Sequence, residues 1–400
     1  MKQCSIADLK PGMVLGMSIH GYFGSKRTLL LGMKAKLTAP IIGKLESIGY
    51  SFVYIEEEGI EDVIPEDLLS EETRDNSLLA ISGYYEKIHS TVKDLIRKDD
   101  KAIDILKQQG ATINLPKIAP LKESLNNIIQ DLFLIGSVDG GYHTISGISR
   151  FNAIHKHVLS VAVISLLIGN EFGYVDSEQT ILGMGALLHD VGKAVLPGIY
   201  EKRYWELDQS EHAIMREHSR LGEKLLSGVM SISEAERQII IQHHERQDGK
   251  GYPFGLQGDN SVPVKSHYIK PNHVFRFAEI VAVADMFDNL VSGNYYPHRL
   301  SPEEALNELF KEAGTGLNTE IIRTLSSLVI LYPVASIVKI EKHPDPDLEG
   351  YEGVVAKADG PESDIVEVII LYDADGKRIS PRPEKIYLDE HELYKLAVAR

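Results

Sequence analysis

Histidine and aspartate side chains recur in apolar surroundings in the middle of the sequence. The pair His189-Asp190 follows Ala186-Leu187-Leu188, and Asp285 follows the apolar run from Val281 to Ala284. A carboxylate that is buried without a partner costs several kcal/mol or takes up a proton. Further histidines lie inside or at the end of segments with helical periodicity, and these are His157, His218, His243 and His244.

A set of this kind indicates a metal centre. A single buried histidine is more often a hydrogen-bonded core residue than a ligand, so the prediction depends on the set and not on one member. Imidazole and carboxylate groups from different helices of a bundle are a common ligand set for iron, manganese or zinc. Cys4 is the only cysteine in the sequence, which excludes a structural zinc site built from thiolates.

The segment from His243 to Pro253 runs from the end of an expected helix into a glycine-rich turn. Two adjacent histidines at a helix end can reach one centre because regular helical geometry relaxes there. Gly249 and Gly251 allow the backbone to turn sharply and to approach a ligand closely. A simple surface turn would not need the histidine pair, Glu245 and Asp248 beside it.

The residues from His189 to Lys193, His-Asp-Val-Gly-Lys, are followed by this His243–Pro253 segment. Together they resemble the HD-GYP family of bacterial cyclic-di-GMP phosphodiesterases, a branch of the HD superfamily of metal phosphohydrolases. The similarity extends over residues 152–333. It includes Glu211, His218 and the segments 283–288 and 301–306.

The resemblance implies which residues bind metal. One ion would be held by His157, His189, Asp190 and Asp285. A second ion would be held by His218, His243 and His244, with Asp190 as a bridge. His155 competes with His157, which is preferred because it places residues 161–163 where the family's helix has its core residues. The cofactors implied are two divalent ions, iron or manganese.

The resemblance also implies roles for other residues. Asp190 and Lys193 would act in catalysis, with Lys193 in contact with a substrate phosphate. The residues expected to contact the substrate are Lys193, Gly251, Tyr252, Asn294 and Tyr296. The acidic residues expected to support the ligands from behind are Glu211, Glu245 and Asp248. Glu211 lies seven residues before His218, on nearly the same face of an expected helix.

The implied reaction is hydrolysis of cyclic di-GMP. Two cations can polarise a phosphoryl oxygen and convert a bridging water into hydroxide near neutral pH. Some family members bind a third metal through a Glu four residues before the first histidine, and this position is Ala153 here. A site for two metals, with linear pGpG as the product, is therefore expected.

Asn294 stands where the family usually has an Arg that contacts the ligand's phosphate. A charge-assisted hydrogen bond is worth roughly 1.5–3 kcal/mol, so its loss would weaken affinity about 10- to 100-fold. Arg299 or His298 could substitute from nearby. The alternatives left open are a cyclic-dinucleotide-binding module with weak turnover, a hydrolase of a related cyclic dinucleotide, and another HD-type phosphohydrolase.

The composition restricts the partners. A net charge of −16 argues against binding to nucleic acid polymers, so an anionic substrate needs metal ions or a few placed lysines. No apolar run is long enough to span a membrane and no secretory signal is visible. The single cysteine fits a cytoplasmic location. A homodimer or a signalling-protein partner is left open.

A helical scaffold must position these residues, and we expect an α+β fold that is predominantly α. Helices are expected over 156–169, 179–189, 211–226, 233–244 and 274–291, and a hairpin tip at Asp375-Gly376. The expected regions are a small β-rich N-terminal domain (1–65), a helical linker region (66–138), a helical HD-GYP catalytic domain (139–334) and a small β-rich C-terminal extension (335–400).

Overall fold

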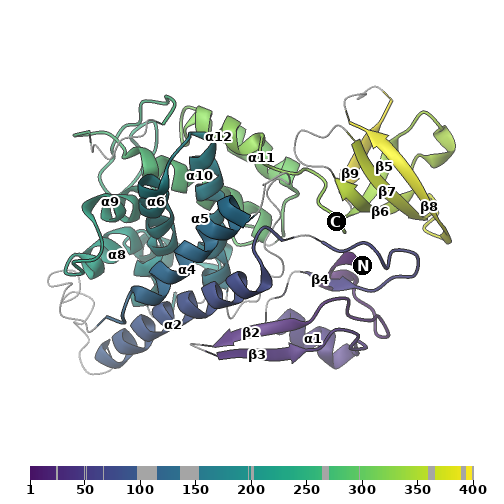
Figure 1. Cartoon of the computed structure of the whole chain (residues 1–400), viewed down its shortest axis with the longest axis horizontal. Coiled ribbons are helices and arrows are strands. Elements are labelled where there is room, and N and C mark those ends of the chain that lie inside the picture. Colours follow the sequence, from purple (N-terminus) through teal and green to yellow (C-terminus); the bar gives the residue numbers. More distant parts are fainter. Residues whose placement is uncertain are drawn as a thin grey trace.

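The computed structural model confirms an α+β fold that is mainly helical, with a helical bundle beside two β-rich units (Figure 1). The residues that the structure describes are 1–23, 26–48, 50, 52–65, 67–96, 115–135, 153–196, 198–199, 202–263, 270–296, 298–358, 365–388 and 393–398. None of the helices in these ranges is long and apolar enough to cross a bilayer.

The bundle is built around two nearly continuous apolar helices, α5 (Ala153–Glu171) and α10 (Arg276–Ser292). Their side chains are buried on most sides, as expected for helices in the middle of a bundle. The helices around them are α6 (Asp176–Leu188), α8 (His218–Leu226), α9 (Glu234–Gln242), α11 (Pro302–Lys311) and α12 (Thr319–Ser326).

Local sequence signals fix where several of these helices begin and end. Ser233 caps α9 by accepting from the amide of Glu236, and Glu236 reaches back to the amide of Ser233. Ser301 and Glu304 form the same reciprocal pair at the start of α11. Gly293 ends α10 in the left-handed conformation, with φ of 74°.

The prediction of a single helix over residues 211–226 is wrong, because the structure has two helices there. The first is α7 (Gln209–Met215), and α8 begins at His218. The ring nitrogen Nδ1 of His218 lies 2.6 Å from the carbonyl oxygen of Met215. In a continuous helix this carbonyl oxygen would accept from a backbone amide. The break therefore places His218 at the first turn of α8.

The region expected to be a helical linker packs into the same core as the bundle. Helices α2 (Glu71–Ile96) and α4 (Ala119–Gln130), with a short π-helical turn η2 (Asp131–Ile135), contribute buried residues such as Leu78 and Leu125 to it. The Tyr85 hydroxyl of α2 donates to the carbonyl oxygen of Leu187 at 2.8 Å. These helices thus support the end of α6, where His189 follows.

The N-terminal unit contains two separate two-stranded pairings. Strand β1 (Lys2–Ser5) pairs antiparallel with β4 (Phe52–Ile55), and β2 (Ile19–Phe23) pairs with β3 (Lys26–Leu31). Helix α1 (Ala39–Ser47) and the short 3-10 helix η1 (Ile6–Asp8) join β1 and β4 around a small apolar core.

The C-terminal unit is a five-stranded antiparallel sheet in the order β8-β7-β6-β5-β9. The strands are β5 (Ile337–Lys342), β6 (Glu352–Ala358), β7 (Ile365–Tyr372), β8 (Arg378–Tyr387) and β9 (Lys395–Val398), and the 3-10 helix η6 (Pro346–Leu348) follows β5. The expected hairpin tip is confirmed, since Asp375 and Gly376 lie in the turn between β7 and β8.

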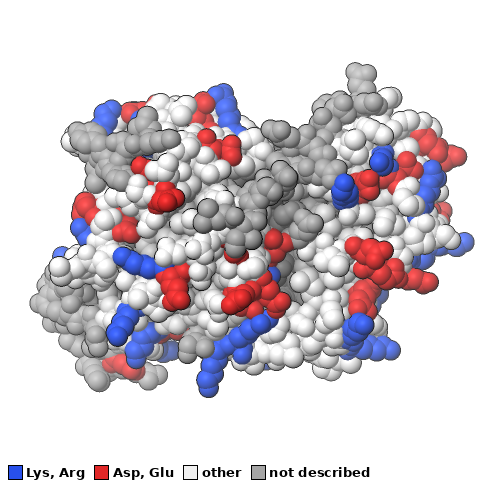
Figure 2. Space-filling model, in the orientation of Figure 1, with Lys and Arg blue, Asp and Glu red and all other residues white. Residues whose placement is uncertain are grey.

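The N- and C-terminal units lie side by side, away from the centre of the bundle (Figure 1). Buried residues of both units, including Ile60, Val63 and Leu371, share a small apolar core. Lys2 and Glu57 form an ion pair at 2.5 Å beside Tyr372 of the sheet. On the face drawn in Figure 2, acidic and basic side chains of the described residues are interspersed.

Candidate metal centre

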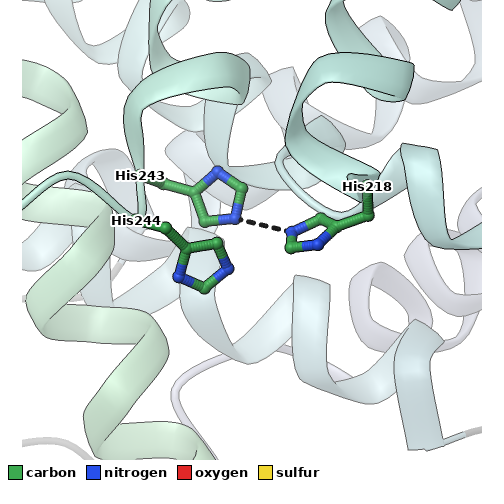
Figure 3. A group of neighbouring side chains, drawn as sticks. All are labelled: His218, His243 and His244. Atoms are coloured by element: carbon green, nitrogen blue, oxygen red, sulfur yellow. Dashed lines mark hydrogen bonds between the residues drawn. The ribbon is translucent and has the colours of Figure 1, made fainter. Parts of the chain in front are cut away.

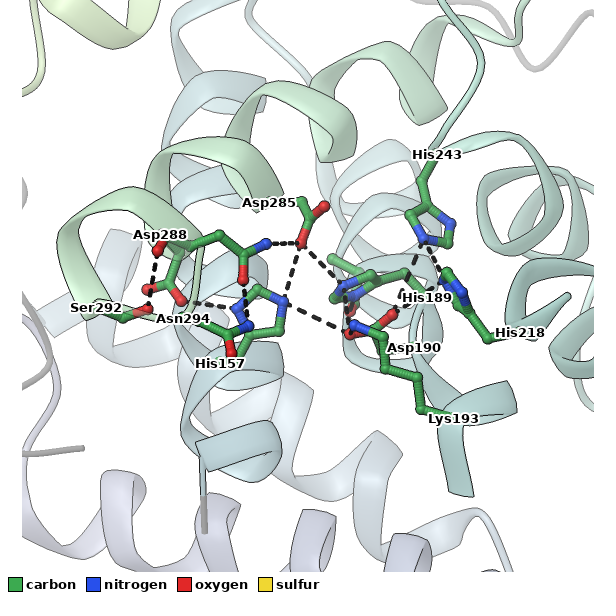
Figure 4. Close-up of polar contacts among 12 residues, drawn as sticks. His157, His189, Asp190, Lys193, His218, His243, Asp285, Asp288, Ser292 and Asn294 are labelled. Atoms are coloured by element: carbon green, nitrogen blue, oxygen red, sulfur yellow. Dashed lines mark hydrogen bonds and ion pairs between the residues drawn. The ribbon is translucent and has the colours of Figure 1, made fainter. Parts of the chain in front are cut away.

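The predicted ligands come from different helices and meet inside the bundle (Figure 4). His157 projects from α5, and His189 and Asp190 follow the last turn of α6. His218 begins α8, His243 and His244 follow α9, and Asp285 lies in α10. The structure therefore brings together residues that are up to 128 positions apart in the sequence, as the spacing of His157 and Asp285 shows.

Asp190 lies between two groups of side chains, and each of its carboxylate oxygens faces one of them. Its Oδ2 is 3.6 Å from Nε2 of His157 and 3.5 Å from Nε2 of His189. Its Oδ1 is 3.2 Å from Nε2 of His218 and 4.0 Å from Nε2 of His243. This is the arrangement that a carboxylate needs if it is to bridge two cations.

The two groups each offer ligand atoms that converge on one point. The first consists of His157, His189 and Asp190, and the second of His218, His243 and His244. Asp285 joins the first group, with its Oδ1 2.9 Å from Nε2 of His157 and 3.6 Å from Nε2 of His189.

Backbone carbonyls orient three of the imidazoles. Nδ1 of His189, His218 and His243 lies 2.7, 2.6 and 2.8 Å from a carbonyl oxygen three residues earlier in the chain. A carbonyl can only accept, so Nδ1 must carry the proton, and Nε2 of the neutral ring then presents a lone pair. The same helix-end geometry thus aims three ligand nitrogens into the centre.

The inward-facing nitrogens fit a cation. Nε2 of His218 and Nε2 of His243 are only 3.1 Å apart (Figure 3), and two lone pairs at this distance repel each other without a positive charge beside them. Nε2 of His189 is buried and has no hydrogen-bond partner among the described residues. Buried polar atoms without a partner are rare in folded proteins, and an ion is one explanation for them.

The pKa values of the second group suit metal ligands. Burial lowers the pKa of His218 to about 4 and that of His244 to about 3. Burial also brings the pKa of His243 well below its ordinary value. These imidazoles are consequently neutral at pH 7, which is the state that binds metal.

The first group carries more negative charge. Burial opposes ionisation of Asp190, but the positive charge of the nearby Lys193 acts against burial, and the pKa of Asp190 is lowered. Burial alone would lower the pKa of His157, but hydrogen bonds to Asp285 and Asp288 outweigh it and raise the pKa to about 10. A protonated His157 therefore compensates the negative charge of these carboxylates. A metal ion could supply this positive charge instead.

Further hydrogen bonds hold the side chains of this group in place. Nδ1 of His157 lies 2.7 Å from Oδ2 of Asp288. Asn289 donates from Nδ2 to Oδ1 of Asp285 at 2.8 Å, and Asn294 donates from its own Nδ2 to Oδ1 of Asn289 at 2.5 Å. Asn294 is thus linked to Asp285 through Asn289.

A cavity of about 350 Å³ opens over the centre and has the size of a small-molecule site. The predicted substrate contacts that line it are Lys193, Gly251, Tyr252 and Asn294. Lys193 also pairs with Oδ2 of Asp190. The Tyr252 ring stacks on His244, with ring centroids 4.7 Å apart and planes at 25°. Tyr296 does not line the described cavity and packs against the apolar core.

The acidic residues expected to support the ligands contact other groups. Glu211 pairs with Lys202 and bonds the amide of Asp208 in a capping box. Glu245 accepts from the amides of Phe254 and Leu256 at 2.7 and 2.9 Å, and so holds the Gly-Tyr-Pro turn. Asp248 pairs with Arg246 and accepts from the amide of Lys250 at 3.0 Å.

Two histidines and an arginine considered from the sequence lie elsewhere. His155 is buried against the ring of Tyr85, with centroids 6.0 Å apart, and does not belong to either ligand group. His298 stacks on Tyr296, 5.9 Å away. Arg299 stacks its guanidinium over the Phe52 ring at 4.3 Å, outside the described lining of the cavity.

Sequence reasoning missed residues that act through neighbours or come from loops. Asp288 and Asn289 follow Asp285 by three and four positions, so the helical repeat could have placed them on the same face as this ligand. Tyr204, Arg216 and Tyr295 also line the cavity. Tyr204 lies in a single 3-10 turn and Tyr295 in a loop, and both segments are too short for periodicity to give a signal.

Comparison with known proteins adds independent findings. Residues 149–321 match the family model described as HD domain. The chain is 35% identical over 149 residues to the cyclic di-GMP phosphodiesterase response regulator RpfG of Xanthomonas campestris. The aligned region covers 37% of this chain and 36% of that protein. The chain is also 30% identical over 197 residues to a cyclic di-GMP phosphodiesterase of Thermotoga maritima, and this region covers 49% of this chain and 50% of that protein.

A further relative is named for a different cyclic dinucleotide. The chain is 29% identical over 178 residues to the 3'3'-cGAMP-specific phosphodiesterase 2 of Vibrio cholerae, with 44% of this chain and 32% of that protein covered. The chain therefore spans half or less of the length of each of these three relatives.

Proposed function

We propose that this chain is a metal-dependent phosphodiesterase of the HD-GYP type that acts on cyclic di-GMP. Residues 149–321 match the family model described as HD domain, and two of the relatives are named as cyclic di-GMP phosphodiesterases. The observation that carries this proposal is the position of Asp190. Its two oxygens face two separate groups of ligand atoms under one cavity.

Two divalent ions, iron or manganese, would be held by these groups. His157, His189 and Asp285 would hold one ion, and the three histidines of the second group would hold the other, with Asp190 shared. Such ions supply Lewis acidity toward a phosphoryl oxygen and activate water as a nucleophile. Imidazole with carboxylate is a ligand set that suits iron and manganese.

The side chains of the cavity would bind and orient the substrate. Lys193 lies beside Asp190, so its ammonium group is placed to contact a phosphate oxygen next to the ions. Tyr252 would form one wall of the phosphate site, since its ring is fixed on His244. Linear pGpG is the proposed product, because Ala153 offers no ligand for a third ion.

The test is hydrolysis by the purified 400-residue chain loaded with Fe(II) without oxygen, or with Mn(II). We expect conversion of cyclic di-GMP to pGpG, followed by chromatography, and loss of at least about a thousandfold in rate for Asp190→Asn. Trp205→Ala is a matched control, since Trp205 is exposed and lies outside the described lining of the cavity.

A panel of 3'3'-cGAMP and nucleoside phosphates under the same conditions separates the competing functions. Preference for 3'3'-cGAMP would assign the chain to the chemistry named for its Vibrio relative. Binding of cyclic di-GMP without product from either metal-loaded form would mean that the protein is a binding module and not an enzyme.

A further inference from the structure

Two tyrosines form an exposed stacked pair in the cavity of the metal centre. Tyr204 belongs to the 3-10 helix η5 (Tyr204–Glu206), and Tyr295 lies in the loop after α10. Their ring centroids are 5.0 Å apart and their planes are nearly parallel, at 8°. The two residues remain 44% and 37% exposed, respectively, so the pair is not part of the apolar core.

Contacts with the surrounding segments hold the pair in place. The amide of Tyr204 donates to the carbonyl oxygen of Asn294 at 3.2 Å, which ties η5 to the loop that carries Tyr295. His212 of α7 packs on Tyr204 with centroids 4.5 Å apart. Tyr296 contacts Tyr295 edge to face, with centroids 5.0 Å apart and planes at 84°, and so restricts the ring of Tyr295. Aromatic surface that is already ordered costs little entropy on binding.

The pair shares its cavity with the metal ligands and with cationic side chains. Both rings line the same space as Asp190 and Lys193. Arg216 also lines it and lies over the Tyr252 ring, with Cζ 5.3 Å from the centroid. A small molecule that fills this cavity would thus contact the predicted metal-binding residues and cationic side chains in one part and exposed aromatic rings in another.

We propose that Tyr204 and Tyr295 form a stacking platform for a purine base of the substrate whose phosphodiester lies at the metal centre. This inference rests on the proposed function and adds a base-binding subsite to it. Stacking uses the face of a base and not its hydrogen-bonding edge, so the platform accepts guanine and adenine alike. Discrimination between cyclic purine dinucleotides would then depend on other residues.

Steady-state kinetics of the metal-loaded full chain provide the first test. Removing one stacking ring weakens binding about 10- to 100-fold per base. We expect Tyr204→Ala and Tyr295→Ala to raise KM for cyclic di-GMP by at least about tenfold while kcat changes less than about threefold. Tyr204→Phe and Tyr295→Phe should restore KM, because phenylalanine keeps the ring. Trp205→Ala, a neighbouring exposed aromatic outside the described lining, should leave KM unchanged.

Unchanged KM in both alanine variants would overturn the platform. A fall in kcat together with loss of bound metal, without a rise in KM, would overturn it too, since that pattern indicates a structural role.

A binding assay separates this inference from the proposed activity. The probe is 2-aminopurine riboside 5′-monophosphate, whose fluorescence is quenched when its base stacks on an aromatic ring. We expect the wild-type protein to quench it and the double variant Tyr204→Ala/Tyr295→Ala not to. Quenching without hydrolysis of cyclic di-GMP would retain the platform and refute the activity. Hydrolysis without quenching would retain the activity and refute the platform.

Discussion

Asn289 is not among the predicted metal ligands, but its contacts predict an effect on metal affinity. Its amide donates to Asp285 and accepts from Asn294, so it orients the carboxylate of a predicted ligand. Asn289→Leu keeps the size of the side chain and removes both hydrogen bonds. Loss of such a supporting contact typically weakens metal affinity about 10- to 100-fold. Titration of Mn(II) against a fluorescent chelator measures this loss directly.

The matched control is Asn294→Ala, which shortens the same chain by its outer member and leaves the Asn289–Asp285 bond intact. Its effect on Mn(II) affinity should be much smaller than that of Asn289→Leu. Equal affinity of the Asn289→Leu and wild-type proteins would show that Asp285 needs no hydrogen bond from Asn289 to bind metal.

At the scale of single residues, the sequence indicated which side chains could bind metal but not which hydrogen bonds they make. His157 and Asp285 could be proposed as ligands because polar groups in apolar helices need a partner. Asn294 was expected to contact substrate, and the structure adds a bond to Asn289 that the motif does not reveal. Hydrogen-bond partners depend on rotamers and on packing between helices, and neither can be read from spacing.

At the scale of elements, Gly192 allows the segment after Asp190 to lie close to the start of α8. Gly192 lies in the 3-10 helix η4 (Val191–Val195), which packs against α8. A Cβ atom at Gly192 would lie 1.8 Å from the carbonyl oxygen of His218 and 2.7 Å from the amide nitrogen of Gly222. Both are backbone atoms, so η4 and α8 would have to separate.

We therefore expect Gly192→Ala to lower the free energy of unfolding by about 1–3 kcal/mol or more and to reduce bound metal. Urea denaturation and metal analysis measure the two effects. Gly43→Ala is the control, because a Cβ there meets nothing within 4 Å in helix α1. That change should be neutral or stabilise by up to about 1 kcal/mol. If Gly192→Ala behaved like the control, the close contact would not matter.

Helix boundaries can be predicted where a capping residue marks them, and not where a side chain replaces a backbone hydrogen bond. Ser233 marks the start of α9 and Gly293 the end of α10, and both residue types are known capping signals. The break before His218 could not be seen, because the periodicity of apolar residues continues across it. There the ring of His218 bonds the carbonyl of Met215, which only the folded structure reveals.

At the scale of the whole molecule, the N-terminal unit contacts the bundle through residues that are near site residues in the sequence. Lys156 of α5, next to His157, lies with Nζ 5.8 Å from the Tyr50 ring. Arg299, five residues after Asn294, stacks on Phe52 of β4. The sequence predicted a β-rich N-terminal unit and a helical bundle, but their contact could not be predicted, since it joins residues with no shared periodicity.

The contact of Arg299 with Phe52 has an energy that can be measured. The guanidinium lies 4.3 Å from the ring centroid, and Nε donates to the carbonyl oxygen of Val291 at 2.8 Å. A cation over an aromatic ring contributes about 0.5–2 kcal/mol, and the hydrogen bond about 1 kcal/mol more. Arg299→Ala should therefore lower the free energy of unfolding by roughly 1–3 kcal/mol.

A double-mutant cycle with Phe52→Leu isolates the part that joins the two units. Because the hydrogen bond to Val291 does not involve Phe52, only the stacking term should appear as coupling, about 0.5–1.5 kcal/mol. Arg299→Lys keeps the charge but loses the flat stacking surface and the Nε bond, so it should recover only part of the stability. Strictly additive effects in urea denaturation would mean that the N-terminal unit rests beside the loop of Asn294 and Tyr295 without holding it.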